Sequence, residues 1–204
     1  MNKSELRKKY GYDENDFILI YIAEFIPRKN HAFLLNAIPA LKEQITGLKV
    51  ILPGKGMLLK EMKKLAIDLE IDDIVKFLGY RKDIAYLCQA SDIYVSVSLQ
   101  EGLPVSVIEA MACGLPIVAS DIRGHRDNVV DGENGFLFAL GDSKRMCGSI
   151  LNIYKSMDFR ERFSSNSVEF AKKYDLKSIR LKMAKIYDEA VASLWWGAAR
   201  TARA

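Results

Sequence analysis

Short apolar runs and amphipathic segments alternate along the first two thirds of the chain. Four segments have helical periodicity, HAFLLNAIPALKEQI, GMLLKEMKKLAIDLE, RKDIAYLCQA and PVSVIEAMACG. The apolar runs have the length of buried strands and lie at Phe17–Ala23, Leu48–Leu52, Ile74–Gly79, Asp92–Ser98, Pro116–Ser120 and Gly135–Ala139. Strands that alternate with helices predict a parallel sheet covered on both faces. We therefore expect one doubly wound α/β domain.

The pattern changes after Gly141, where three helical segments follow one another without an intervening strand. These segments begin at Asp142, Asp158 and Leu176, and we expect them to pack against the edge or face of the sheet. Residues 195–204 lack apolar periodicity, so we expect a disordered tail there and assign residues 1–194 to the domain.

The composition is that of a soluble globular protein. Of the 204 residues, 50% are hydrophobic and 27% are charged, and the formal net charge is +4 at pH 7. This mild basic excess favours an anionic ligand or a membrane surface, and no basic cluster with interleaved aromatic residues indicates nucleic-acid binding. No run approaches the roughly 18 apolar residues of a membrane span. Cys88, Cys113 and Cys147 lack metal-ligand spacing and fit a reduced, cytoplasmic protein.

The loops beyond the carboxyl ends of the strands are the places to search for a site, because open parallel sheets bind ligands there. EFIPRKNH offers Arg28 and Lys29, and PGKG at residues 53–56 offers a flexible backbone with one lysine. In LQEGLP, Gly102 permits close approach of a ligand and Pro104 suits the first turn of a helix. Free N–H groups and the helix dipole bind anions at such a position, so we expect a phosphate site.

Two carboxylates, Glu101 and Glu109, flank this helix start inside an apolar run, and each needs a polar partner. Taken alone, a residue like Glu109 is more often a helix-border carboxylate paired with a lysine, and a string like PGKG is more often a simple turn. Neither GxGxxG nor GxxxxGK[ST] occurs, so dinucleotide and ATPase sites have no fingerprint here. We expect His31 in the first turn of a helix and His125 in a glycine-flanked loop. No arrangement of Ser, His and Asp indicates a triad, and no metal site is expected.

Together these blocks resemble the C-terminal, donor-binding domain of the retaining family 4 (group 1) glycosyltransferases of the GT-B fold. The resemblance spans about residues 16 to 187 and rests on EGLPVSVIEAMACGLPIVAS, in which seven residues separate the two glutamates. It is supported by PRKN, PGKG, VKFLGYRKDI, ASDIYVSVS and RGHRDNVVDGENGFLF. The resemblance implies a Rossmann-like domain that is half of a two-domain enzyme, without its N-terminal acceptor domain.

The resemblance also implies a role for each matching residue. Lys29 and Glu101 would be catalytic, with Lys29 at the diphosphate and Glu101 at the donor sugar. Glu109 would bind the ribose hydroxyls. The remaining donor-binding positions would be Arg28, Gly54, Gly56, Tyr80, Arg81, Gly102, Leu103 and Pro104. The arginine that commonly precedes the lysine in this pattern is missing, since Ala23 and Glu24 stand there. Two alternatives remain open: Arg28 substitutes for it, or the diphosphate is bound more weakly.

The implied reaction transfers a sugar from a UDP- or GDP-sugar to an acceptor hydroxyl with retention, without a metal or other cofactor. The implied partners are the nucleotide sugar, an acceptor sugar or lipid-linked sugar, and the missing N-terminal domain. We expect a role in surface polysaccharide or glycolipid synthesis, in the cytoplasm, with the full enzyme at the inner face of the membrane. The chain alone should be inactive. Two alternatives remain open, a non-catalytic nucleotide-sugar-binding partner domain and a sugar-nucleotide epimerase of the GT-B fold.

Overall fold

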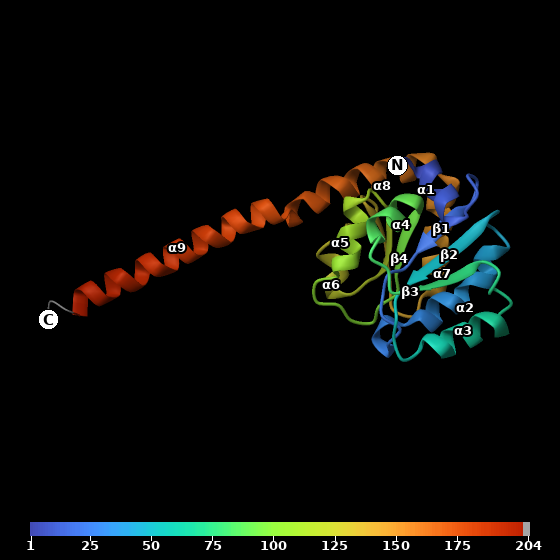
Figure 1. The fold of residues 1–204 in the computed structure, drawn as a ribbon, viewed down its shortest axis with the longest axis horizontal. Coiled ribbons are helices and arrows are strands. Elements are labelled where there is room, and N and C mark those ends of the chain that lie inside the picture. The colour runs from blue at the N-terminus through green and yellow to red at the C-terminus, as the bar shows by residue number, and fades with distance from the viewer. Residues whose placement is uncertain (202–204) are drawn as a thin grey trace. The chain divides into compact units, whose positions relative to one another are not determined.

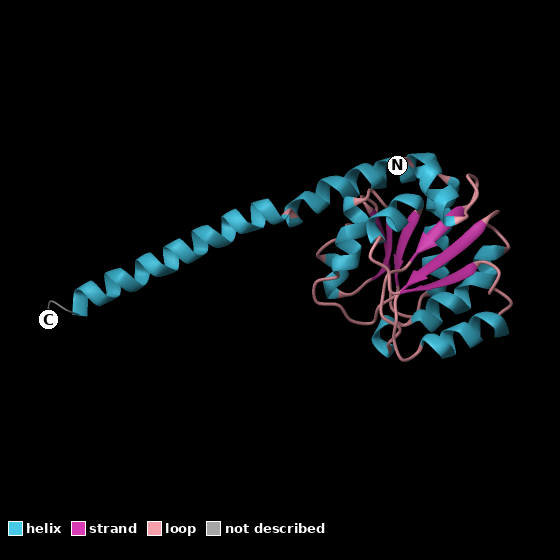
Figure 2. Cartoon of the chain, in the orientation of Figure 1, coloured by secondary structure: helices cyan, strands magenta, loops and turns pink. Residues whose placement is uncertain are grey.

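The computed structural model describes residues 1–201, and Ala202–Ala204 lie outside the described part, as do the side chains of residue 178 and of residues 193–201. The chain divides into two units, Met1–Phe170 and Ala171–Ala204, which are described separately. The first unit holds the sheet and the helices packed on it (Figures 1 and 2).

The centre of the first unit is a six-stranded, fully parallel sheet with the strand order β3-β2-β1-β4-β5-β6. Its strands are β1 (Phe17–Ile20), β2 (Leu48–Pro53), β3 (Val75–Gly79), β4 (Ile93–Ser96), β5 (Ile117–Ser120) and β6 (Gly135–Phe138). Each expected apolar run contains one strand, and the doubly wound fold class is confirmed. The order reverses between β1 and β4, where a ligand crevice is expected in such sheets.

Burial explains why the strands have nearly continuous apolar sequences. Every residue of β1, β4 and β5 is buried, because helices cover both faces of the sheet. The edge strand β3 is less covered, with Lys76 exposed. After Ile20 the chain stays extended, and the backbone N–H groups of Tyr21 and Ala23 still donate to the β2 carbonyls of Ile51 and Pro53.

The helices of the first unit fall into two groups, one on each face of the sheet (Figure 1). α2 contacts both α3 and α7, while α4 contacts both α1 and α5. Right-handed crossovers between parallel strands place the helices in this way. The bounds are α1 (Lys3–Tyr10), α2 (His31–Lys42), α3 (Leu59–Asp68), α4 (Ile84–Ala90), α5 (Val105–Ala112), α6 (Arg123–Arg126), α7 (Ser143–Lys155) and α8 (Met157–Ala171), with a 3₁₀ turn at Pro27–Lys29.

Aromatic side chains fix two of the helices that follow the last strand. Phe136 of β6 makes edge contacts with Phe159 and Phe163 of α8, at ring-centroid distances of 5.5 and 5.1 Å. Tyr154 of α7 contacts Phe17 of β1 at 4.9 Å. α7 and α8 therefore pack on the sheet, as the apolar pattern predicts.

The second unit contains a 3₁₀ turn at Lys172–Tyr174 and the helix α9 (Leu176–Thr201). α9 continues through most of the segment for which the sequence predicts a disordered tail. Alanine and arginine are strong helix formers, so a segment without apolar periodicity can still extend a helix. Among the described residues, no helix is both long enough and apolar enough to cross a membrane.

α1 is attached to the sheet through a nearly buried ion pair. Arg7 donates to an Asp92 oxygen over 2.6 Å, and the two side chains are only 7% and 13% exposed. Asp92 also accepts from the backbone of Ile18 over 2.7 Å and from Lys3 over 2.6 Å. Arg7 donates further to the carbonyls of Ala90 and Glu14, so each of its three guanidinium nitrogens has an acceptor.

Asp92→Ala should lower the free energy of unfolding by about 3 kcal/mol, because it leaves the buried guanidinium of Arg7 without a counter-charge. Urea denaturation would measure the change. Asp68→Ala is the control, since its pair with Lys64 is exposed and should contribute less than about 0.5 kcal/mol. Similar losses in the two variants would contradict the anchoring role of Asp92.

Candidate functional site

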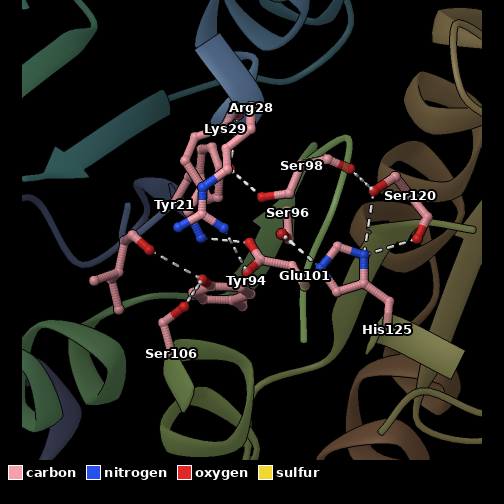
Figure 3. Close-up of polar contacts among 11 residues, drawn as sticks. Tyr21, Arg28, Lys29, Tyr94, Ser96, Ser98, Glu101, Ser106, Ser120 and His125 are labelled. Atoms are coloured by element: carbon pink, nitrogen blue, oxygen red, sulfur yellow. Dashed lines mark hydrogen bonds and ion pairs between the residues drawn. The ribbon is translucent and has the colours of Figure 1, made fainter. Parts of the chain in front are cut away.

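The loops that follow β1 and β4 meet at the point where the strand order reverses. The 3₁₀ turn Pro27–Lys29 ends at Asn30, which has a left-handed backbone with φ of 53°. The backbone N–H of Leu99 donates to the carbonyl of Arg28 over 2.8 Å and joins the two loops. Lys29 Nζ, from the first loop, forms an ion pair with Glu101 Oε1, from the second (Figure 3).

This ion pair is largely withdrawn from water, since the side chains of Lys29 and Glu101 are 15% and 9% exposed. Burial alone would raise the pKa of Glu101, but hydrogen bonds from Lys29 and Ser98 and the charge of Lys29 outweigh it and lower this pKa. Glu101 is therefore ionised at neutral pH. Arg28 approaches the other carboxylate oxygen at 3.9 Å and is 52% exposed, so it stands at the rim of the site.

A chain of buried hydroxyl groups supports the loop that carries Glu101 (Figure 3). The hydroxyl of Tyr21 donates to the carbonyl of Lys29 over 2.8 Å and contacts Ser98 Oγ, also at 2.8 Å. The hydroxyl of Ser120 donates to the carbonyl of Ser98 over 2.5 Å. These bonds fix the backbone on both sides of the ion pair.

His125 is the last member of this series of hydrogen-bonded side chains, next to the end of β5. Its Nδ1 lies 2.7 Å from the carbonyl oxygen of Ser120, and its Nε2 lies 3.0 Å from Ser96 Oγ. The structure thus places His125 in the short helix α6 and fully buried, rather than in an open loop. Its neighbour Gly124 lies directly against the turn formed by Glu101 and Gly102, where an added Cβ would stand 2.6 Å from the carbonyl oxygen of Glu101.

The start of α5 has the features of an anion site. Pro104 is the residue before the helix, and within the described part of the chain no side chain caps the free N–H groups of the first turn. A Cβ on Gly102 would meet no atom within 4 Å, so the backbone there is open to a ligand. Leu103 is 59% exposed beside it. The sequence-predicted positions Gly102, Leu103 and Pro104 therefore lie together at an accessible helix start.

Glu109 lies one turn further along α5, on its exposed side. Among the described residues it makes no recorded hydrogen bond or ion pair, so it is not the lysine-paired carboxylate of the alternative interpretation. Partial burial of the carboxylate raises the pKa of Glu109. An acid that lacks a protein partner beside an anion site is available to accept hydrogen bonds from a ligand.

A cavity of about 330 Å³ lies at the carboxyl ends of β1, β2 and β3. Its lining includes Gly54, Tyr80 and Arg81, three of the sequence-predicted donor positions. Gly54 and Gly56 let the loop after β2 press against the loop after β1. An added Cβ would stand 1.9 Å from the carbonyl oxygen of Ala23 at Gly54, and 2.5 Å from that of Phe25 at Gly56.

Two basic side chains at this cavity, Arg81 and Lys55, differ in their partners within the protein. Arg81 binds Asp83, with Nε 2.8 Å from Oδ1, and its guanidinium also lies over the ring of Tyr10. The charge of Arg81 is thus already neutralised within the protein. Lys55 Nζ lies 5.7 Å from the centre of the exposed ring of Tyr80, at the lining of the same cavity.

Several polar residues of the site are not distinguished by the sequence motifs. Tyr21, Ser96 and Ser120 look like ordinary residues at the ends of apolar runs, and the only signal is that each follows a buried strand or ends it. His31 begins α2 as expected, but it is buried and stacks on Phe25 at 4.1 Å between ring centres. Burial lowers the pKa of His31 to about 4, so the ring is neutral. No cluster of His, Cys, Asp or Glu suited to a metal ion occurs among the described residues.

Comparisons with known proteins agree on one family. A family model described as glycosyl transferases group 1 matches residues 2–170. The EpsD protein of Bacillus subtilis (strain 168) is 36% identical over 187 residues, which cover 92% of this chain and 49% of that protein. The UDP-Gal:alpha-D-GlcNAc-diphosphoundecaprenol alpha-1,3-galactosyltransferase of Escherichia coli is 29% identical over 157 residues, which cover 75% of this chain and 41% of that protein.

A solved structure shows the same fold with ligands. The crystal structure of Anabaena Alr3699/HepE in complex with UDP and glucose matches with a TM-score of 0.84 and 27% identity, over 92% of this chain and 52% of that one. The present chain thus spans about half the length of the curated relatives that it matches.

Gly54→Ala should lower the free energy of unfolding by about 1–3 kcal/mol, because the new methyl group collides with the carbonyl of Ala23. Gly148→Ala is the matched control. A Cβ at this position in α7 meets no atom within 4 Å, so alanine should raise stability by about 0.5–1 kcal/mol. Thermal denaturation of both variants would show opposite shifts, and a neutral Gly54→Ala would mean that the two loops do not press together.

Proposed function

Because this chain belongs to the group 1 glycosyltransferases, as its motifs indicate, we propose that it is the donor-binding half of a GT-B enzyme. It would bind a UDP- or GDP-sugar for retaining transfer to an acceptor hydroxyl, without a metal. The observation that carries the proposal is the ion pair between Lys29 and Glu101, which spans the reversal point of the sheet beside the start of α5.

The diphosphate would replace Glu101 as the partner of Lys29. A diphosphate carries more negative charge than a single carboxylate, and the open N–H groups of α5 would bind the same anion. The positive charge and the helix start would also stabilise the departing nucleoside diphosphate, the role that metal ions play elsewhere. Arg28, at the rim, would add a second charge.

The displaced carboxylate of Glu101 would face the donor sugar. There it would accept hydrogen bonds from sugar hydroxyls and oppose the positive charge that develops at the anomeric carbon. Glu109, which has no partner among the described residues, would accept hydrogen bonds from the ribose hydroxyls. The cavity lined by Gly54 and Tyr80 would hold the base.

The likeness to the Anabaena structure with UDP and glucose supports this class of ligand. The acceptor site and part of the catalytic machinery would lie on an N-terminal domain, since the chain covers only about half of its curated relatives. We propose that the whole enzyme acts in the cytoplasm, at the inner face of the membrane, on an acceptor sugar or lipid-linked sugar of a surface polysaccharide or glycolipid.

Substitution of the two partners of the ion pair should change nucleotide affinity in opposite directions. Lys29→Ala should weaken UDP binding by about 1.5–3 kcal/mol, roughly ten- to a hundredfold, because a charged hydrogen bond is lost. Glu101→Gln should strengthen UDP binding by up to about 1 kcal/mol, because Lys29 no longer has a competing carboxylate. Calorimetric titration with UDP, GDP and ADP would measure both changes and identify the base.

Lys64→Ala serves as the charge control for this experiment, because Lys64 pairs with Asp68 on the exposed side of α3 and should not affect binding. Equal losses in Lys29→Ala and Glu101→Gln would indicate that the ion pair only supports the fold. Negligible heats for all nucleotides with the parent chain would contradict the donor site itself.

The chain alone should bind the donor without transferring sugar, and transfer should appear when it is joined to the N-terminal half. Product formation with a sugar acceptor, followed by chromatography, would measure this. Epimerisation or hydrolysis of the nucleotide sugar without an acceptor would instead favour the epimerase alternative. A joined protein that binds the donor and never transfers would favour the non-catalytic partner domain.

A further inference from the structure

His125 is held in a defined tautomer by its two neighbours. The carbonyl oxygen of Ser120, 2.7 Å from Nδ1, can only accept a hydrogen bond, so Nδ1 carries the proton. Burial lowers the pKa of His125, which keeps the ring neutral at pH 7. Nε2 is then an acceptor, and the hydroxyl of Ser96 donates to it over 3.0 Å. The ring thus ties α6 to the ends of both β4 and β5.

Gly124, the residue before His125, lies directly against the turn that carries Glu101, the carboxylate proposed to face the sugar. An added Cβ at Gly124 would stand 2.6 Å from the carbonyl oxygen of Glu101, 2.8 Å from its Cβ and 2.8 Å from the carbonyl oxygen of Gly102. The backbone of α6 and the Glu101 turn are therefore in direct contact. In addition, Asn128 Nδ2 donates a hydrogen bond to the carbonyl of Gly124 over 2.8 Å, which helps to hold Gly124 in this position.

Lys29 has two anchors that do not bond directly to His125. Its carbonyl accepts from Tyr21 over 2.8 Å, and the loop before it is joined to the β4 side through Arg28 and Leu99. None of these bonds involves His125. A shift of α6 would therefore loosen the support of Glu101 directly, whereas it would reach Lys29 only through the chain of hydroxyl groups.

We infer that His125 is a positioning residue for the donor sugar, which holds Gly124 against the Glu101 turn and so sets where the carboxylate of Glu101 meets the sugar. The inference rests on the proposed function and extends it to a residue that does not touch the donor. Loss of the imidazole hydrogen bonds to Ser96 and Ser120 should therefore affect recognition of the sugar more than recognition of the nucleoside diphosphate.

The test compares UDP with UDP-glucose as ligands of the present chain. His125→Phe keeps a ring and removes the hydrogen bonds to Ser96 and Ser120, and it should weaken binding of UDP-glucose by about tenfold while binding of UDP changes by less than about threefold. Ser96→Ala is the milder variant, should the first not fold, and should shift the ratio of the two dissociation constants in the same direction. Ser149→Ala is the control, because Ser149 is buried in α7 and its hydroxyl has no hydrogen-bond partner among the described residues.

Nitrogen NMR of the imidazole rings gives a readout that does not depend on the ligand. The chain has two histidines, so the signal lost in His125→Phe identifies His125. A neutral ring with the proton on Nδ1 at pH 7 supports the positioning role, and a ring protonated on Nε2 would overturn it. Equal losses of affinity for UDP and UDP-glucose would overturn the role of His125 alone. A parent chain that binds neither ligand would overturn the proposed function together with this role.

Discussion

The pairing of β1 with β4 at the centre of the sheet determines which loops can meet. The loop after β1 brings a positive charge, Lys29, and the loop after β4 brings a negative charge, Glu101. The hydrogen bond from the backbone N–H of Leu99 to the carbonyl of Arg28 joins the two loops. Residues 72 positions apart in the sequence thus become direct partners, and the remaining features of the site are arranged around this contact.

The polar groups beneath the site are buried, and they persist there because nearly all of them are satisfied. An unpaired hydroxyl in such a place would cost several kcal/mol, whereas a fully bonded chain of hydroxyls stiffens its surroundings. Tyr21, Ser98 and Ser120 each end or follow a central strand. The hydroxyls of Tyr21 and Ser120 donate to loop carbonyls, and Ser98 Oγ lies 2.8 Å from the hydroxyl of Tyr21. Side-chain hydrogen bonds therefore hold the loops to the sheet, in addition to the backbone connections.

The sequence predicts the strands and most helices well, because buried parallel strands are almost entirely apolar and the helices between them are amphipathic. The sequence motifs that contain Lys29 and Glu101 identify both residues as candidates. Their contact depends on the order of the strands, which no single motif predicts. The short-range pair of Arg81 and Asp83 and the hydroxyl chain ending at His125 depend on side-chain geometry alone. α9 continues to Thr201 where the sequence predicts a disordered tail, because apolar periodicity does not reflect the helix propensity of Ala198, Ala199 and Arg200.

The two glycines of the loop after β2 have a consequence for the thermodynamics of recognition. At Gly54 and Gly56 the backbones of two loops touch, and backbone N–H groups of one loop donate to carbonyls of the other. The wall of the cavity is consequently built before any ligand arrives. A molecule entering it would lose its own translational and rotational freedom but would not have to order this wall, so differences in affinity between bases should reflect contacts rather than loop entropy.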